Sequence, residues 1–393
     1  MSRLRRLAPA PVSEFLRTDA GAGVLLLLAT VGALVWANSP ARASYDSFWH
    51  HELVVGPGSL AVAEDLRHWV NDALMAVFFF LVGLEIKREV VTGELRDRRA
   101  ALVPVVAAAG GMAVPALVFL AVAGGGEAAR GWGIPMATDI AFAVGILAAL
   151  GDRAPNGLRV FLLSLAIVDD IGAILVIALF YAEGIAFSWL AGAAGAFTVV
   201  LVLRRAEVSQ PLAYLPAGVA VWYCTYRTGI HPTIAAVALG ALVPARPVRG
   251  RPVMDRLEHR LHPWSRFLVV PVFALANAGI ALSADTLSGA AGSRLTWAVA
   301  LGLVAGKLAG IGTAATVAVR LGLGRLPSDV DLGHIWGAAA LGGIGFTVSL
   351  FVTGLAFEQG AAEDQAKIGI LVGSAVAALL GALVLLRRSA APG

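Results

Sequence analysis

The apolar stretches of this chain are too long and too numerous for a water-soluble domain. A run of about 17 to 25 apolar residues is what an α-helix needs to cross a bilayer. We find twelve, and the mean hydropathy of +0.80 agrees. They cover residues 19–38, 64–86, 100–123, 131–150, 158–182, 187–203, 211–226, 230–244, 257–281, 295–319, 334–357 and 366–386. We therefore predict an all-α polytopic membrane protein with twelve transmembrane helices, and read 19–38 as a retained span because it exceeds a signal-peptide core.

The basic residues orient these spans. With the N-terminus in the cytoplasm, 23 of the 30 Lys and Arg residues fall in cytoplasmic connections, among them Arg3, Arg5, Arg6 and Arg17. The positive-inside rule gives this skew for an even number of spans with both termini inside. It explains the net charge of +4 without a nucleic-acid partner. The single lysine left over, Lys307, lies in the middle of span 295–319.

The first extramembrane connection, residues 39–63, alternates apolar and polar residues around the turn sequence 56–58. This pattern predicts a β-hairpin whose edge could pair with a second copy of the chain. A flexible loop is the open alternative. Because Cys224 is the sole cysteine, the sequence excludes an internal disulfide and a cysteine-based metal site.

Four charged residues are expected near the bilayer midplane. Asp169 and Asp170 interrupt the apolar run "LSLAIVDDIGAIL", Asp139 lies near the middle of span 131–150, and Lys307 lies in span 295–319. Each alone costs at least ~2.5 to 3.5 kcal/mol at this depth. One lysine cannot neutralise three aspartates, so we expect the cluster to take up protons or a cation; a purely structural ion pair is the alternative. Adjacent helical residues differ by about 100°, so we predict Asp169 facing Lys307 and Asp170 facing an aqueous cavity.

Two spans carry helix-breaking residues at mid-depth. Pro135 precedes Asp139 in span 131–150, and residues 342–345 of span 334–357 read Gly-Gly-Ile-Gly. Both are predicted to be discontinuous helices, the fourth and the eleventh, which cross in opposite directions as inverted repeats require. We expect Asp139 to neutralise the positive N-terminal ends of the half-helices and Lys307 the negative C-terminal ends. Tight helix packing is the other use of such glycines.

Six blocks of the sequence resemble one known family. They are "NDALMAVFFFLVGLEIKRE" (71–89), "ATDIAFAVGILAALG" (137–151), "LAIVDDIGAILVIALFY" (165–181), "LEHRLHPW" (257–264), "FALANAG" (273–279) and "GGIGFTVSLF" (342–351). Together they resemble the NhaA family of bacterial Na+/H+ antiporters, from about residue 10 to 387.

The resemblance implies roles for named residues. Asp169 and Asp170 would hold the transported Na+ and the protons, Thr138 and Asp139 would lie at the crossing of the broken helices, and Lys307 would be the basic partner. A further group would set the pH response, since histidine titrates near neutral pH. That group comprises Asp72, Glu85, Arg88, Glu89, Glu258, His259 and His262. His231, at the start of span 230–244, is a weaker candidate, because a helix-end histidine is more often satisfied by its neighbours than a sensor.

The resemblance also implies an architecture. Two inverted three-helix repeats, residues 98–184 (helices 3–5) and 290–388 (helices 10–12), would form the core. An interface domain would comprise 1–97 (helices 1–2 with hairpin 39–63) and 205–285, including helices 8–9 in 229–285. Residues 185–228 would hold the linking helices 6–7. The family is usually dimeric through the hairpin, so we expect a homodimer in the bacterial inner membrane.

The predicted activity is electrogenic, pH-regulated exchange of one Na+ or Li+ for about two H+ by alternating access, serving sodium and pH homeostasis. Na+ and Li+ are hard cations that prefer oxygen ligands. They would compete with protons for carboxylates whose titrations are coupled. The partners are these ions and membrane lipid, and we expect no cofactor.

Three rival functions fit the sequence less well. A sodium-coupled solute symporter would need more polar groups at mid-depth than the spans contain. An intramembrane aspartyl protease would pair a Tyr-Asp with a Gly-x-Gly-Asp, but Phe346 follows the Gly-x-Gly at 343–345. A membrane scaffold would not explain the unbalanced midplane charge. We therefore predict a secondary transporter and not an enzyme.

Overall fold

The computed structural model describes residues 19–182, 184 and 186–389. The basic N-terminal residues Arg3, Arg5, Arg6 and Arg17 lie outside the described residues. Within that part of the chain, eight helical stretches are long and apolar enough to cross a membrane, and a bent helix pair makes a ninth. This agrees with a polytopic helical membrane protein. The predicted spans at 211–226, 230–244 and 257–281 correspond to shorter helices, so the count of twelve and the inverted repeats remain predictions.

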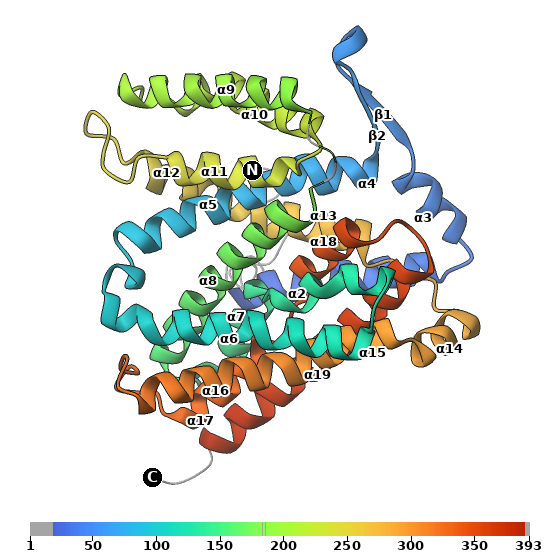
Figure 1. Cartoon of the computed structure of the whole chain (residues 1–393), viewed down its shortest axis with the longest axis vertical. Helices are drawn as coiled ribbons and strands as arrows, with labels where there is room; N and C mark the ends of the chain where they lie inside the picture. Colours follow the sequence, from blue (N-terminus) through green and yellow to red (C-terminus); the bar gives the residue numbers. More distant parts are fainter. Residues whose placement is uncertain (1–18, 183, 185, 390–393) are drawn as a thin grey trace, which may run out of the picture. The chain divides into compact units, whose positions relative to one another are not determined.

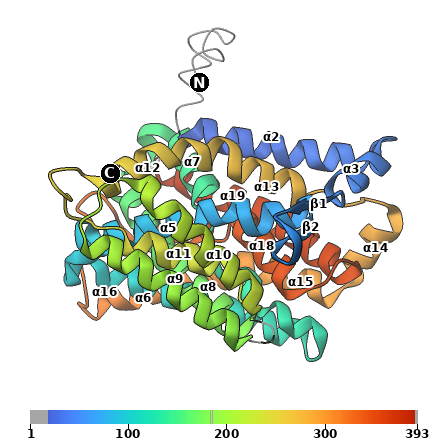
Figure 2. The same cartoon turned by 90° about the horizontal axis from the view of Figure 1, so that it is seen from above.

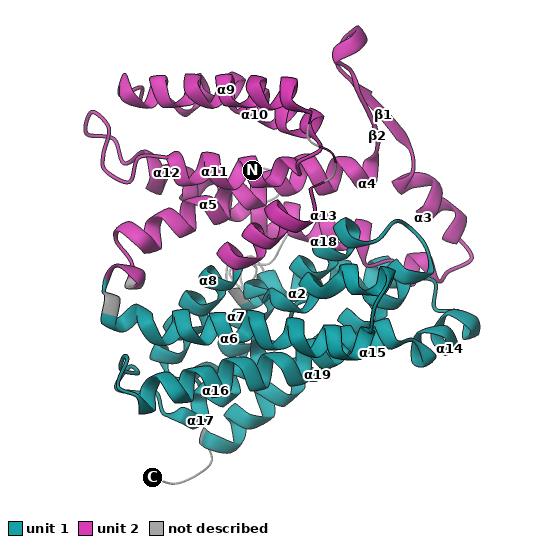
Figure 3. Ribbon diagram, viewed as in Figure 1, with its two compact units in different colours: residues 1–34, 97–169, 280–393 teal, residues 35–96, 170–279 magenta. Residues whose placement is uncertain are grey.

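Two compact units divide the described chain (Figure 3). Unit 1 comprises residues 1–34, 97–169 and 280–393, and unit 2 comprises 35–96 and 170–279. The division falls between Asp169 and Asp170, inside the helix α8 (Asn156–Phe180). The domain limits expected from the sequence remain predictions.

The elements described in unit 1 are all helical. Besides most of α2 (Asp19–Ala37) and part of α8, they are α6 (Arg98–Ala123), η5 (Glu127–Met136), α7 (Ile140–Leu150), η6 (Gly151–Arg153), α14 (Ala284–Gly292), α15 (Arg294–Leu301), η9 (Gly302–Gly306), α16 (Lys307–Arg320), α17 (Leu332–Leu341), α18 (Phe346–Ala356) and α19 (Ala361–Ser389). α6 and α16 pack side by side along much of their length (Figure 1). Their backbones approach so closely that a Cβ at Gly110 would collide with the Gly310 carbonyl. Small residues are what permit such contacts between membrane helices.

Two predicted spans of unit 1 are broken, as their sequences indicate. η5 ends at Met136, the chain is extended through residues 137–139, and α7 begins at Ile140. α17 and α18 are bent by 46° at the glycine-rich break. Proline lacks a backbone N–H and glycine weakens a helix, so the breaks follow from local sequence.

Unit 2 holds the hairpin and the remaining helices. Its elements are α3 (Arg42–Trp49), β1 (Glu52–Val55), η2 (Gly58–Leu60), β2 (Val62–Asp65), α4 (Leu66–Trp69), η3 (Val70–Leu74), α5 (Met75–Val91), η4 (Glu94–Arg96), α9 (Phe187–Arg205), η7 (Pro211–Tyr214), α10 (Leu215–Thr228), α11 (Pro232–Leu242), α12 (Val253–Trp264), η8 (Ser265–Val269) and α13 (Val270–Asn277). α5 packs against α11, and α9 against α10 (Figure 2).

The predicted hairpin is confirmed over a narrower range than expected. β1 and β2 pair antiparallel, from Glu52 opposite Asp65 to Val55 opposite Val62. The first part of the predicted hairpin region, 39–63, instead contains the helix α3. Tyr45 on α3 donates hydrogen bonds to the carbonyls of Leu275 and Ala276, and this distant contact favours a helix where local alternation predicts a strand.

Three short segments, η3, η8 and η9, are π-helical turns. A π-turn inserts one extra residue into a helix, and such turns are frequent at functional sites. η3 contains Asp72, and η9 ends directly before Lys307. Two of the charged residues singled out from the sequence therefore lie in or beside a distorted helical turn.

Candidate functional site

Asp169 and Lys307 form a salt bridge inside unit 1. Asp169 lies on α8, and Lys307 begins α16. The Lys307 Nζ lies 2.5 Å from Asp169 Oδ2, and both side chains are fully buried. Removing two charges from water costs several kcal/mol, which only close pairing and further hydrogen bonds offset. The structure thus brings together the two midplane residues that the sequence analysis paired.

Thr138 joins this pair from the extended segment between η5 and α7. Its Oγ1 lies 3.1 Å from Lys307 Nζ, 2.8 Å from Asp169 Oδ2 and 2.9 Å from the Gly342 carbonyl. A hydroxyl carries one hydrogen and two lone pairs. Thr138 therefore accepts from the lysine and donates to only one of the two oxygens at a time. This one hydrogen is shared between Asp169 Oδ2 and the Gly342 carbonyl at the break of the other discontinuous helix.

The second oxygen of Asp169 completes the candidate site. Oδ1 is buried and has no hydrogen-bond partner among the described residues. A buried, unpaired carboxylate oxygen is costly, and binding either a proton or a hard cation would remove that cost. This atom is the best candidate for a point at which the two compete.

Asp139 links the two broken helices. Its Oδ1 accepts from the Phe142 N–H at 3.1 Å and caps α7. Its Oδ2 accepts from the backbone N–H and the hydroxyl of Thr347, at 3.0 and 2.6 Å, in the first turn of α18. A negative charge at a helix N-terminus is stabilising. Asp139 thus lies at both N-terminal ends, as expected, and both its oxygens are occupied as caps.

The expected neutralisation of the C-terminal ends of the half-helices by the charge of Lys307 remains a prediction. Lys307 contacts Asp169 and Thr138, not the helix-end carbonyls. Hydroxyl groups serve those carbonyls instead: Thr138 reaches Gly342, and Ser349 Oγ donates to the Ile134 carbonyl at 2.7 Å.

Asp170 follows Asp169 on α8 and is also buried, with 6% of its surface exposed. Neighbouring residues on a helix point about 100° apart, so the two carboxylates do not share one environment. The expected opening of Asp170 to water remains a prediction.

In unit 2, α5 and α12 bring together part of the predicted pH-response group. Arg88 pairs with Glu258, and its Nη2 lies 4.0 Å from Asp255 Oδ1. His262 Nε2 lies 3.3 Å from Glu85 Oε1 and 3.5 Å from Glu258 Oε1. The histidine is therefore held between two carboxylates.

The other predicted pH-response residues lie apart from this cluster or at its margin. Glu89 lies on α5, one residue beyond Arg88, and His259 is exposed on α12. Asp72 is half-buried in η3, and its backbone carbonyl accepts from Trp222 Nε1 at 2.8 Å. His231 occupies the N-cap position of α11.

Sequence analysis missed two residues that build the crossing. Thr347 and Ser349 supply hydroxyls to the opposite broken helix, although both stand in the block "GGIGFTVSLF". Hydroxyl residues just after a glycine break in an apolar span were the available signal. Their hydrogen-bond partners lie 208 and 215 residues away in the chain, so no local pattern shows which groups these hydroxyls contact.

The sequence is similar to those of known proteins over nearly its whole length. The profile of a family described as Na+/H+ antiporter 1 matches residues 13–385. "Na(+)/H(+) antiporter NhaA 3" of Frankia alni is 48% identical, over 98% of this chain and 89% of that protein. "Na(+)/H(+) antiporter NhaA" of Proteus mirabilis is 46% identical over 96% of each chain. The protein of that name from Acidovorax sp. is 48% identical, over 95% of this chain and 91% of its own length.

Proposed function

Because the chain belongs to the Na+/H+ antiporter 1 family, we propose that it exports Na+ or Li+ across a bacterial inner membrane in exchange for H+. The observation that best supports this activity is the unpaired Oδ1 of Asp169, buried beside Lys307 and Thr138. An oxygen ligand suits a hard cation. Asp170 on the same helix would supply the second carboxylate, and Na+ is cargo here, not a resident metal.

Exchange follows from competition for these carboxylates. Close carboxylates in a low-dielectric site titrate as a coupled unit. A bound Na+ stabilises their ionised form, so it must displace protons to enter. Protons that return from the other side must in turn displace Na+. Occupancy by one ion excludes the other, and this exclusion couples the two fluxes.

Lys307 would set the stoichiometry. When Na+ binds near Asp169, the positive charge of the lysine is no longer compensated, and its proton is the second one released. Two H+ then enter for each Na+ that leaves, and one net positive charge moves inward. Alternating access would involve the broken helices, whose freed carbonyl and hydroxyl groups can change partners.

Regulation and assembly complete the proposal. The cluster of Glu85, Arg88, Glu258 and His262 would adjust activity to cytoplasmic pH, because the histidine lies between two carboxylates. Both termini would lie in the cytoplasm, and the hairpin would pair with a second copy to form a homodimer. The cellular role would be sodium and pH homeostasis.

The test is cation-induced dissipation of a pH gradient in everted membrane vesicles. After respiration acidifies the interior, adding Na+ or Li+ should restore the fluorescence of a ΔpH dye, whereas K+ should not. Asp170→Asn should abolish the response. Asp285→Asn, at an exposed position on α14, is the matched control and should respond normally. Equal responses from wild type and Asp170→Asn would remove Asp170 from the site.

A further inference from the structure

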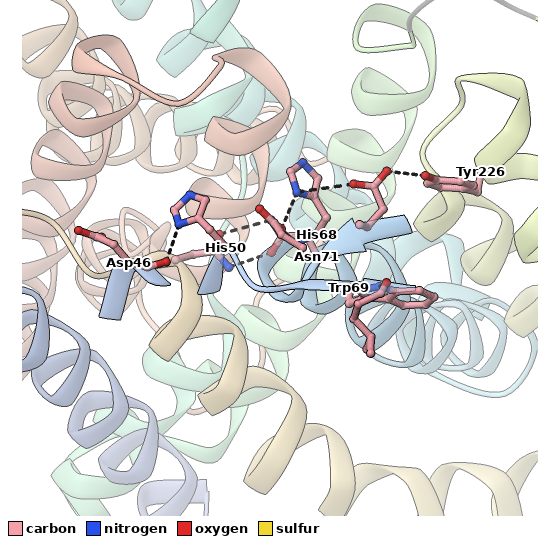
Figure 4. A network of polar contacts seen from close by, with 10 residues as sticks. Asp46, His50, His68, Trp69, Asn71 and Tyr226 are labelled. Atoms are coloured by element: carbon pink, nitrogen blue, oxygen red, sulfur yellow. Dashed lines mark hydrogen bonds and ion pairs between the residues drawn. The ribbon is translucent and has the colours of Figure 1, made fainter. Parts of the chain in front are cut away.

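A second titratable network lies in unit 2, where the hairpin returns to the helices (Figure 4). We call it the His68 network: Glu64, Asp65, His68 and Tyr226. Asp65 caps α4 by accepting from the His68 N–H at 2.8 Å, and its Oδ1 lies 2.7 Å from His68 Nδ1. Glu64 Oε2 lies 4.0 Å from the same nitrogen. Glu64 Oε1 accepts from the Tyr226 hydroxyl at 2.5 Å. One imidazole thus lies between two carboxylates, one of which is bonded to α10.

An aromatic stack connects this network to the π-turn η3. The ring of Tyr226 stacks on Trp222 at 5.8 Å and 8°, and Trp222 stacks on Trp69 at 6.0 Å and 19°. Trp222 also donates its indole N–H to the carbonyl of Asp72. Glu64, Tyr226, Trp222 and the carbonyl of Asp72 therefore form one continuous chain of contacts.

The π-turn is fixed on its other side by a neutral contact. Asn71 in η3 and Asn277 at the end of α13 exchange hydrogen bonds at 2.8 and 3.4 Å. Amides do not titrate, so this contact is independent of pH. Of these two hydrogen-bonded contacts of η3 in the described part of the chain, the one through Trp222 leads to titratable groups.

The charges near the imidazole are predominantly negative. β2 contributes Glu64 and Asp65, η3 contributes Asp72 one turn away, and α10 contributes Tyr226 with the nearby Arg227. The guanidinium of Arg227 lies over the rings of Trp189 and Tyr223. The His68 side chain is 52% exposed, against 30% and 16% for its two carboxylate partners. The imidazole therefore faces water while its two partners are partly sheltered.

We propose that His68 senses pH in the compartment next to the hairpin and controls ion exchange through the π-turn that carries Asp72. This inference rests on the proposed antiport and on an extracellular hairpin. When His68 is protonated, its positive charge holds Glu64 and Asp65 together. When it is neutral, the two carboxylates repel, Glu64 depends on Tyr226 alone, and the stack that supports η3 loosens. External pH thus acts at a place separate from the Glu85, Arg88, Glu258 and His262 cluster.

The test uses right-side-out membrane vesicles with the internal pH clamped while the external pH is varied from about 5.5 to 8.5, the range in which imidazole changes charge. At saturating internal Na+, the wild-type exchange rate should change by about 2- to 5-fold, as expected for a solvent-facing charge pair. His68→Gln keeps a hydrogen-bonding side chain but binds no proton, and should flatten this dependence while leaving the dependence on internal pH unchanged. His50→Gln is the matched control, because His50 is another histidine of this unit, at the end of α3, and contacts the Asp46 carbonyl.

Three results would overturn the inference: wild-type dependence on external pH in His68→Gln, an equal loss of rate at every pH, or flattening by His50→Gln as well. Tryptophan fluorescence of the purified protein supplies a readout that needs no transport, because Trp69 and Trp222 belong to the connected stack. Wild type should show a step with pH that His68→Gln lacks, and a retained step rejects the sensor. Absence of Na+-driven H+ flux in wild type would instead reject the proposed antiport.

Discussion

At the scale of single residues, the proposal depends on how Lys307 shares the negative charge of Asp169. Full burial means that neither group can be solvated in the described arrangement, so each depends on the other. The lysine approaches only Oδ2, and Oδ1 has no partner among the described residues. Asp169 is therefore held in place by one oxygen and left chemically available through the other. A purely structural pair would be expected to satisfy both.

Breaking this pair should destabilise the protein strongly. Lys307→Met leaves an uncompensated buried carboxylate, and we expect a loss of about 3 to 5 kcal/mol in the free energy of unfolding. Asp169→Asn in the same chain should recover much of that loss, which a double-mutant cycle in detergent would measure. Strictly additive effects would contradict the pairing.

A second buried ion pair allows effects on stability to be distinguished from effects on transport. Glu363 and Lys367 lie 2.6 Å apart on α19, with side chains 8% and 3% exposed. Lys367→Met should also lower stability, yet it should leave Na+-dependent proton movement intact, whereas Lys307→Met should impair both. Equal transport by the two variants would show that Lys307 serves only to hold the helices.

At the scale of elements, the crossing of the two broken helices depends on one carboxylate acting twice. Asp139 caps α7 and, through Thr347, also α18. It was identified from the sequence, but its two partners were not, since one of them lies 208 residues away. A cap that serves two helices fixes their N-terminal ends at one point. The positive half-helix ends therefore face a fixed negative charge.

Replacing Asp139 with Ala should weaken both helix starts. A lost N-cap costs about 0.5 to 2 kcal/mol, so two lost caps should cost roughly twice that. Hydrogen exchange should accelerate in the first turns of both α7 and α18. Asp331→Ala is the control because Asp331 caps α17 alone. If Asp139→Ala left the hydrogen-exchange rate in the first turn of α18 unchanged, the double cap would be contradicted.

The Asp331→Ala control is valid at neutral pH, because Asp331 is ionised there. Burial acts to raise the pKa of Asp331, but the His334 N–H and the charges of His334 and Arg388 outweigh it, and the pKa lies below its ordinary value. A lowered pKa in the folded state means that the cap contributes fully above the unfolded-state pKa. The contribution is lost only as pH falls through the folded-state value. Comparisons at pH 7 therefore see the whole effect.

The sequence predicts those features of the fold that are caused by residues close together in the chain, and not those that depend on contacts between distant residues. Pro135 and the glycines at 342–345 indicate the helix breaks. The alternating pattern at 39–63 predicts a hairpin, of which the structure confirms the part that pairs within 52–65. Helix α3 was missed because its contacts come from distant residues. The π-turns were missed because spans that are apolar on all sides have no clear apolar stripe that one extra residue could shift. In the site, charged residues were found because burying them is costly, and Thr138 was found through the family resemblance, while the hydroxyl groups of Thr347 and Ser349 were not found.

At the scale of the whole molecule, the account makes exchange sensitive to the membrane potential. If two H+ enter for each Na+ that leaves, a potential acts on one net charge with about 2.3 kcal/mol per 100 mV. In proteoliposomes without a pH gradient, an inside-negative K+ diffusion potential should accelerate Na+ efflux. Unchanged efflux would indicate one-for-one exchange, with Lys307 as a permanent cation.

The most direct test of competition between Na+ and H+ is a count of protons released when Na+ binds. Isothermal titration calorimetry of the purified protein, repeated in buffers with different ionisation enthalpies, gives this number. We predict release of between one and two protons per Na+, apparent Na+ affinity that rises with pH, and neither effect in Asp170→Asn. Na+ binding without proton release at any pH would contradict the account.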